Sequence, residues 1–185
     1  MKKYFLLLGL GLGLISNVYA NDWFLQAGLH AGGDKLAGVT FTNGTSSSIY
    51  AGGLLSLDGG VNLDLTTNSQ LRLAVGYKFD NISASNGSIT FDRTTLDASW
   101  FYWVNSAWCL GVGVTQHLNP VLSGSGVTAG RVAFKDATGM VVEADFQLAG
   151  GMYWGGKFTS IEYETLSGSA KVNGNSAGIL FGWRF

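Results

Sequence analysis

The stretch Ala177-Gly178-Ile179-Leu180-Phe181-Gly182-Trp183-Arg184-Phe185 at the end of the chain decides the fold. Apolar and aromatic residues occupy every second position of it, and small or polar residues stand between them apart from Leu180. Successive side chains of a β-strand point to opposite faces, so one face of this strand is apolar and aromatic. A strand that turns such a face to lipid and ends on an aromatic residue is typical of a transmembrane β-barrel.

The first 20 residues predict a cleavable export signal. Lys2 and Lys3 precede an apolar stretch over residues 4–15, and Val18 and Ala20 occupy the small-residue positions of a cleavage site. An apolar stretch of about twelve residues is too short to span roughly 30 Å of hydrocarbon as a helix. We therefore expect residues 1–20 to be a signal peptide and residues 21–185 to form one outer-membrane barrel domain.

Composition excludes several classes of function. Without Lys2 and Lys3 the chain has 9 basic and 12 acidic residues, a formal charge of −3, which argues against a nucleic-acid partner. Cys109 is the only cysteine, so the sequence offers neither an internal disulfide nor a cysteine-based zinc site. We expect no cofactor and no metal. Only 12% of the residues are charged, which is not typical of a soluble protein surface.

The inner and outer faces of neighbouring strands predict the first long hairpin of the barrel. Residues that face each other on antiparallel strands share a side of the sheet, so a turn must join the two apolar faces. A turn at residues 67–69 meets this condition and sets Asp64 opposite Arg72. The same register sets Asp58 opposite Lys78, which predicts two charge pairs inside the barrel.

Two glycine-containing dipeptides predict further tight turns. Asn-Gly at residues 86–87 is a favoured two-residue hairpin turn, and counting outward from it pairs Asp80 with Arg93. Gly-Gly at residues 155–156 predicts a turn after which the acidic residues of the next strand face inward.

The pattern repeats along the whole chain. Eight strands are expected, within residues 23–31, 57–65, 71–79, 95–102, 108–117, 140–154, 158–164 and 176–185. An even number of strands with both ends on the periplasmic side is what bacterial barrels require. Four longer loops are expected near residues 32–48, 80–93, 119–139 and 167–175. The sequence thus predicts an all-β fold, an eight-stranded antiparallel up-and-down transmembrane β-barrel preceded by a cleavable signal peptide, in the outer membrane of a Gram-negative bacterium.

Inward-facing charges are expected to pair with one another and fill the lumen. An eight-stranded barrel is just wide enough for side chains, and charges shut away from water need partners. The expected network consists of seven acids and three bases: Asp58, Asp64, Asp97, Glu143, Asp145, Glu162, Glu164, Arg72, Lys78 and Arg184. The surplus of acids leaves room for protonated carboxyls, trapped water or a bound cation, and a cation-conducting pore is the functional alternative.

Aromatic residues near the strand ends predict a girdle at the membrane–water interface. The residues assigned to this girdle are Trp23, Trp100, Tyr102, Trp108, Trp154, Trp183 and Phe185.

With this strand pattern, these aromatics and the terminal residues Gly182, Trp183, Arg184 and Phe185, the mature chain resembles the small eight-stranded outer-membrane barrels of the OmpA/OmpX type. The terminal residues look like the signal that the barrel-assembly machinery reads. The resemblance implies outer-membrane lipid and lipopolysaccharide as surroundings, and an extracellular ligand at the loops. Barrels of this type include structural anchors, adhesins, small-solute pores and lipid-modifying enzymes, so the fold alone does not choose the function.

Two histidines are the candidates for catalysis. His30 and His117 are both assigned to inward faces, where an imidazole could orient a nucleophile such as Ser123 or Ser125. Lipid A deacylases of this fold carry a His-x-Ser-Asn run, whereas Asn119 stands at the serine position here. We therefore expect no catalytic residue, and His117 to be a hydrogen-bonded histidine at the rim.

The sequence favours a non-enzymatic outer-membrane protein with a structural or surface-interaction role. A lipid A modifying acyl hydrolase or transferase is the second hypothesis, and a small-solute or cation pore is the third. Five apolar residues in the predicted loops either bind a partner by edge pairing or pack against one another or against lipopolysaccharide: Val39, Phe41, Ile82, Ile89 and Phe91.

Overall fold

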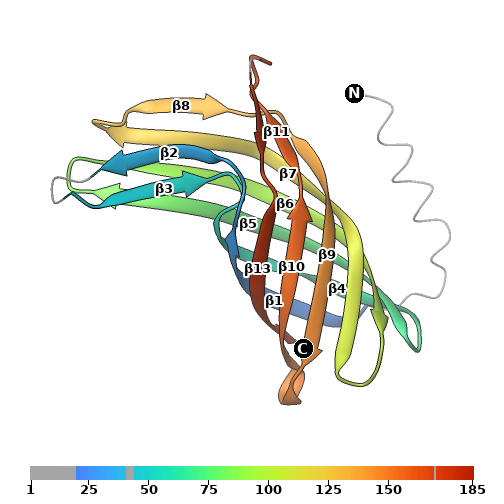
Figure 1. Cartoon of the computed structure of the whole chain (residues 1–185). Coiled ribbons are helices and arrows are strands. Elements are labelled where there is room, and N and C mark those ends of the chain that lie inside the picture. The colour runs from blue at the N-terminus through green and yellow to red at the C-terminus, as the bar shows by residue number, and fades with distance from the viewer. Residues whose placement is uncertain (1–19, 41–43, 169) are drawn as a thin grey trace.

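A closed antiparallel barrel forms the body of the protein (Figure 1). The computed structural model describes residues 20–40, 44–168 and 170–185. The barrel wall consists of eight strands: β1 (Ala20–Ala31), β4 (Leu54–Thr66), β5 (Ser69–Ala84), β6 (Gly87–Trp103), β7 (Trp108–Gly126), β9 (Ala137–Gln147), β10 (Met152–Ser160) and β13 (Ser176–Arg184). Pairing of β6 with β7 and of β1 with β13 closes the wall. The predicted fold class is confirmed, while residues 1–19 of the predicted signal peptide lie outside the described residues.

The remaining strands belong to one end of the barrel. They are β2 (Lys35–Thr40), β3 (Ser46–Tyr50), β8 (Gly130–Ala133), β11 (Glu162–Glu164) and β12 (Lys171–Asn173). β2 pairs with β3, β11 with β12, and β8 extends the wall beside β7. In Figure 1 the far ends of β5, β6 and β7 project well beyond the rest of the barrel, and β2, β3 and β8 lie beside them. We call this part, residues 35–40, 46–50, 80–92 and 119–134, the extension.

Side chains alternate between the two sides of the wall as the strand period requires. On β6, Trp100 is 46% exposed while Phe101 is fully buried, and on β7 Leu110 is 50% exposed while Cys109 is fully buried. The predicted inner and outer faces of β4, β5, β6, β7 and β9 agree with this alternation. Large exposed apolar residues on a folded chain mark the surface that meets lipid.

The turn between β4 and β5 is shorter than predicted. Thr67 and Asn68 form it, and a bulge between Asp64 and Thr66 takes up the extra residue. Consequently Asn62, not Asp64, lies opposite Arg72. The shift is two residues, so each side chain keeps its predicted face although the predicted partner is wrong.

The same shift separates Asp58 from Lys78. Asp58 lies opposite Gly76 in the observed register. A side chain at Gly76 would collide with the Asp58 carboxylate, so glycine is required where this acid turns inward.

The hairpin between β5 and β6 also turns one residue earlier than predicted. Ser85 and Asn86 form the turn, and Gly87 begins β6. A Cβ atom on Gly87 would lie 2.5 Å from the carbonyl oxygen of Ser125, so this glycine permits close approach of β7 instead of forming the turn. Arg93 therefore pairs across the ladder with Lys78 and not with Asp80.

The predicted turn at residues 155–156 is wrong. Both glycines lie inside β10, and the turn is the 3-10 segment η1 (Ala149–Gly151), where Gly150 and Gly151 have positive φ. A side chain at Gly155 would collide with Asp145 of the neighbouring strand, which explains a glycine at that position. Without a turn there, the side chains of β10 and β11 after residue 156 that were predicted to face inward face outward, and those predicted to face outward face inward.

A disulfide cross-link distinguishes the observed register of β4 and β5 from the predicted one. In a Cys109→Ala background, Leu63→Cys with Leu71→Cys places two cysteines directly opposite each other, within the Cα separation that a disulfide accepts. We expect rapid oxidation of this pair and slow oxidation of Leu63→Cys with Leu73→Cys, measured by electrophoretic mobility. Faster oxidation of the second pair would restore the register predicted from the sequence.

Candidate functional site

The lumen is filled by polar and charged side chains. Among the described residues, ten charged side chains are buried or nearly so, and positive and negative charges balance: Arg72, Lys78, Arg93, Lys157 and Arg184 against Asp58, Asp80, Asp97, Glu143 and Asp145. The surplus of acids inferred from the sequence is therefore not present inside the barrel. Ion pairs join Arg72, Lys157 and Arg184 to Asp97, Glu143 and Asp145, while Asp58, Lys78 and Arg93 form hydrogen bonds to neutral groups.

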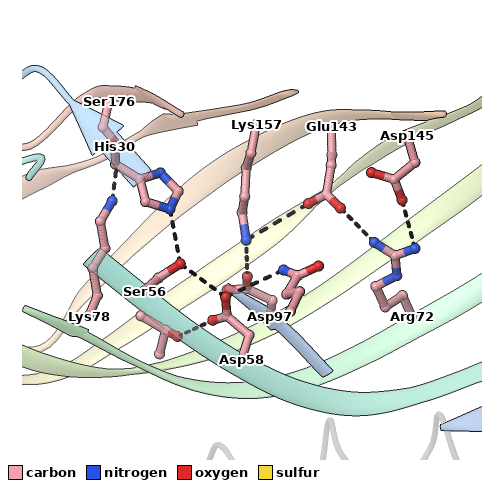
Figure 2. Close-up of polar contacts among 12 residues, drawn as sticks. His30, Ser56, Asp58, Arg72, Lys78, Asp97, Glu143, Asp145, Lys157 and Ser176 are labelled. Carbon is pink, nitrogen blue, oxygen red and sulfur yellow. Dashed lines mark hydrogen bonds and ion pairs between the residues drawn. The ribbon is translucent and has the colours of Figure 1, made fainter. Parts of the chain in front are cut away.

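Arg72 lies on β5 close to the turn after β4 and contacts two carboxylates of β9, Glu143 and Asp145 (Figure 2). Its guanidinium donates to Glu143 at 2.5 Å, to Asp145 at 2.8 Å and to the side-chain oxygen of Asn62 at 3.1 Å. The guanidinium carbon also lies 4.0 Å from the centre of the Phe101 ring. Such a fork of charged hydrogen bonds fixes both carboxylates in place.

Lys157 joins this group to the middle of the lumen (Figure 2). Its ammonium lies 2.5 Å from Asp97 and 3.9 Å from the second oxygen of Glu143. Lys157 was not predicted to face the lumen, because a turn at residues 155–156 would have placed its side chain on the outer face. The alternation of Tyr153, Lys157 and Thr159 is the signal that could have found it.

Asp58 is held by neutral hydrogen-bond donors. Ser56 donates to it at 3.1 Å, and Gln26 and Thr95 donate at 3.4 Å. His30 Nε2 lies 3.0 Å from the Ser56 hydroxyl oxygen, so His30, Ser56 and Asp58 form one chain of contacts (Figure 2).

Lys78 and Arg93 lie side by side beneath the extension. They pair across the β5–β6 ladder, and both are almost fully buried. Lys78 donates to Ser176 at 3.1 Å, while Arg93 donates to the carbonyl oxygens of Ala51 and Gly53 at 3.1 and 2.8 Å. The backbone of the segment between β3 and β4 thus covers the top of the charged lumen.

An apolar core lies directly above these residues. Its buried members come from the extension and from the adjoining strand ends: Ile49, Ala51, Ile82, Ile89, Phe91, Phe134, Ala137, Ile161 and Tyr163. Phe91 contacts Phe134 and Tyr163 edge to face with ring centres 5.7 Å apart. Ile82, Ile89 and Phe91 therefore pack against one another, and Val39 packs against them. This agrees with one of the alternatives predicted from the sequence. Phe41 lies outside the described residues.

Three acids assigned to the lumen lie elsewhere. Asp64 is exposed near the end of β4, and Glu162 and Glu164 are on the outside because β11 has the reversed parity. Glu164 accepts a hydrogen bond from Lys135 at 2.6 Å, and this contact lowers the pKa of the Glu164 carboxyl. Lys171 donates to Glu162 at 2.7 Å, which raises the pKa of the lysine. These are exposed pairs at the loop end of the barrel.

The seven aromatic residues assigned to a girdle are all exposed, between 40% and 59%. They lie on the outer face toward the end of the barrel that carries the short turns. Trp108 packs edge to face against Phe146, and Trp183 lies against Phe185 with ring centres 5.2 Å apart. The Trp183 indole donates to the carbonyl oxygen of Gly150 in the turn.

The two histidines contact different hydroxyl groups, His30 that of Ser56 and His117 that of Tyr163. His117 Nδ1 lies 2.5 Å from the Tyr163 hydroxyl, whereas the Ser125 hydroxyl contacts Ser88 near the tip of the extension. In the group around His30, the carboxylate of Asp58 accepts from the serine, while in a catalytic triad the acid orients the imidazole. Both histidines are almost fully buried, out of reach of a lipid substrate.

The space left in the lumen is small. The cavity among these charged and hydroxyl groups has a volume of about 20 Å³. A cavity of this size and polarity accommodates one water molecule. No group of acidic, histidine and cysteine side chains that could hold a metal ion occurs among the described residues.

A closed eight-stranded barrel with an apolar outer band, exposed aromatics near its short-turn end and a charge-filled interior defines an outer-membrane β-barrel protein of a Gram-negative bacterium. Known structures share this fold. Ail, the attachment invasion locus protein of Yersinia pestis, solved in complex with the heparin analogue sucrose octasulfate, has a TM-score of 0.52 at 9% identity, over 89% of this chain and 98% of Ail.

A second crystal structure of Ail has a TM-score of 0.52 at 8% identity, over 89% of this chain and 98% of Ail. Neisserial surface protein A has a TM-score of 0.48 at 10% identity, over 88% of this chain and 95% of that protein. No family model matches the sequence, and no curated protein sequence matches it significantly. The likeness is to small outer-membrane barrels as an architecture.

Proposed function

We propose that this protein is non-enzymatic and that its barrel is a closed membrane anchor for a folded extracellular binding module, the extension. The observation that carries the proposal is the apolar core of the extension, which lies above a lumen already filled by charged and polar side chains. Bacterial barrels keep short turns on the periplasmic side and long loops outside the cell, which orients the extension outward.

The interior argues against the other two hypotheses. A pore needs a continuous aqueous path, whereas the described lumen is blocked by the contacts of Arg72 and Lys157 and by the core above Arg93. An acyl hydrolase or transferase needs an accessible nucleophile beside a base, and His117 contacts Tyr163 instead.

The remaining expectations from the sequence become part of this proposal. Residues 1–20 serve as the signal peptide and residues 21–185 as the mature domain. The exposed aromatics act as an interfacial girdle, and β13 is the strand that the barrel-assembly machinery reads. Outer-membrane lipid and lipopolysaccharide surround the wall. The extracellular ligand binds to the extension, by analogy with the sucrose octasulfate bound to Ail.

Three measurements separate the hypotheses. The purified protein in planar bilayers should give no stepwise conductance, and lipid A from cells with and without the gene should have the same mass spectrum. Cells that display the protein should bind immobilised heparin better than cells displaying Phe91→Ala, in which the core of the extension is truncated. Conductance steps would favour the pore, and a change in lipid A acylation would favour the enzyme.

A further inference from the structure

The extension is a two-layered structure whose second layer is incomplete. Its first layer is a sheet made of the ends of β5, β6 and β7 together with β8. Its second layer is the β2–β3 hairpin, which contacts β5 and β6 through β3. Figure 1 shows the hairpin lying along the sheet, with β2 on the side of β8. Four strands are thus covered by only two.

The uncovered part lies over β8. Leu122 and Val132 face each other across the β7–β8 ladder and so point to the same side of the sheet. Leu122 packs against the apolar core, whereas Val132 is 43% exposed. The β2–β3 hairpin therefore covers Leu122 but leaves Val132 uncovered.

A mainly apolar groove occupies this position. It has a volume of about 210 Å³ and runs between Ala37 of β2 and Val132 of β8, with Ile89 and Leu122 also lining it. The size suits a few side chains and not a bulky ligand. Strand addition characteristically offers such pockets for alternate side chains of an extended peptide.

The edge of β2 beside the groove is free to form a ladder. Within the described residues, β2 pairs with β3 alone. An edge strand presents alternate backbone N–H and C=O groups that bind another extended chain. A peptide placed there would form hydrogen bonds with β2 while its apolar side chains cover Leu122 and Val132.

We propose that the extension accepts an extended segment of a partner protein as a third strand beside β2, completing the cover over β7 and β8. This inference rests on the proposed function, since it specifies the ligand of the extension. The incoming segment binds by β-strand addition at residues 35–40 and has apolar residues at every second position.

The charge beside the groove defines the outward-facing residues of that segment. Lys35 begins β2 opposite the exposed Tyr50, and it forms no ion pair with another described residue. Acidic residues on the outward face of the incoming strand complement this cation. A second copy of β2 is a poor occupant because its sequence, Lys-Leu-Ala-Gly-Val-Thr, brings a further cation and no acid.

A defined peptide tests the inference. The probe is a fluorescent nine-residue peptide, Glu-Val-Thr-Val-Glu-Val-Thr-Val-Glu, titrated against the full protein in detergent micelles. We expect saturable binding, measured by anisotropy, and slower amide exchange at residues 35–40. N-methylation of alternate residues on the edge facing β2 should weaken binding about tenfold, and lysine in place of glutamate should weaken it to a similar extent. Equal binding of the N-methylated peptide, or no binding at all, would overturn the proposal.

Matched valine substitutions locate the site on the protein. Val132→Asp places a charge in the groove and should weaken peptide binding about tenfold. Val104→Asp, at the opposite end of the barrel and 55% exposed, should leave it unchanged. Protection of residues 35–40 that depends on protein concentration without peptide would mean self-association and would also overturn the proposal. If displaying cells bind immobilised ligands but the peptide does not bind, strand addition fails while the proposed surface-binding function stands.

Discussion

Replacement of Arg72 by methionine should lower the free energy of unfolding by about 3–5 kcal/mol, because it leaves buried carboxylates without their partner. Glu143 and Asp145 both receive a hydrogen bond from this guanidinium, and both are almost fully buried. Methionine keeps most of the side-chain volume, so the loss reports on charge and not on a cavity. Urea unfolding of the protein in lipid vesicles, followed by tryptophan fluorescence, measures the change.

Removing a carboxylate that loses its partner in Arg72→Met is the control for this experiment. The double variant Arg72→Met, Glu143→Gln should recover most of the lost stability, since the charges that remain in the lumen balance and Asp145 keeps its ion pair with Arg184 at 3.6 Å. Arg72→Lys should fall between the wild type and Arg72→Met, because a lysine cannot reproduce the bidentate fork. Equal stability of Arg72→Met and the wild type would contradict the assignment of Arg72 as the centre of the lumen network.

The second large effect concerns the outer face. Val75 is 57% exposed on β5, opposite Gly59 and Leu96. Val75→Arg should cost about 2–4 kcal/mol, because it places a charge toward the middle of the apolar band. Folding titrations in vesicles of fixed thickness measure this cost.

The same substitution in a turn provides the comparison. Val104 has nearly the same exposed fraction as Val75, 55%. It lies in the turn after β6, at the short-turn end of the barrel where water is within reach. Val104→Arg should cost about 0–1 kcal/mol. The inward-facing Thr115→Ser, which keeps a small hydroxyl, should be almost silent. If Val75→Arg and Val104→Arg cost the same, β5 does not cross the membrane with this face toward lipid.

Period-two alternation was sufficient to predict the barrel and most of its inner and outer faces, because a wall one strand thick leaves each side chain only two directions. Register was harder to predict. A bulge after Asp64 and an earlier turn before Gly87 each shifted the pairing by two residues, and an even shift leaves no trace in the apolar pattern.

The lumen was predicted only in part for a related reason. Glycines at 155–156 resemble a turn, although Gly155 is needed for close approach to Asp145. Reading them as a turn reversed the parity beyond them, so Glu162 and Glu164 replaced Lys157 in the predicted network. Packing of Ile82, Ile89 and Phe91 against one another was one of the alternatives from the sequence, but their partners Ile49, Phe134 and Tyr163 were not foreseen because they are far apart in sequence.

The seam between β1 and β13 has a consequence for how the barrel folds. Phe24 lies opposite Arg184, whereas the ladders of β4 with β5, β5 with β6 and β6 with β7 join consecutive segments. Loop-closure entropy penalises contacts between distant segments, so local hairpins zip first and the β1–β13 seam closes late. Until then both seam strands expose unpaired backbone to the bilayer, where such groups are costly. Closure of this one ladder should therefore be the rate-limiting event of membrane insertion.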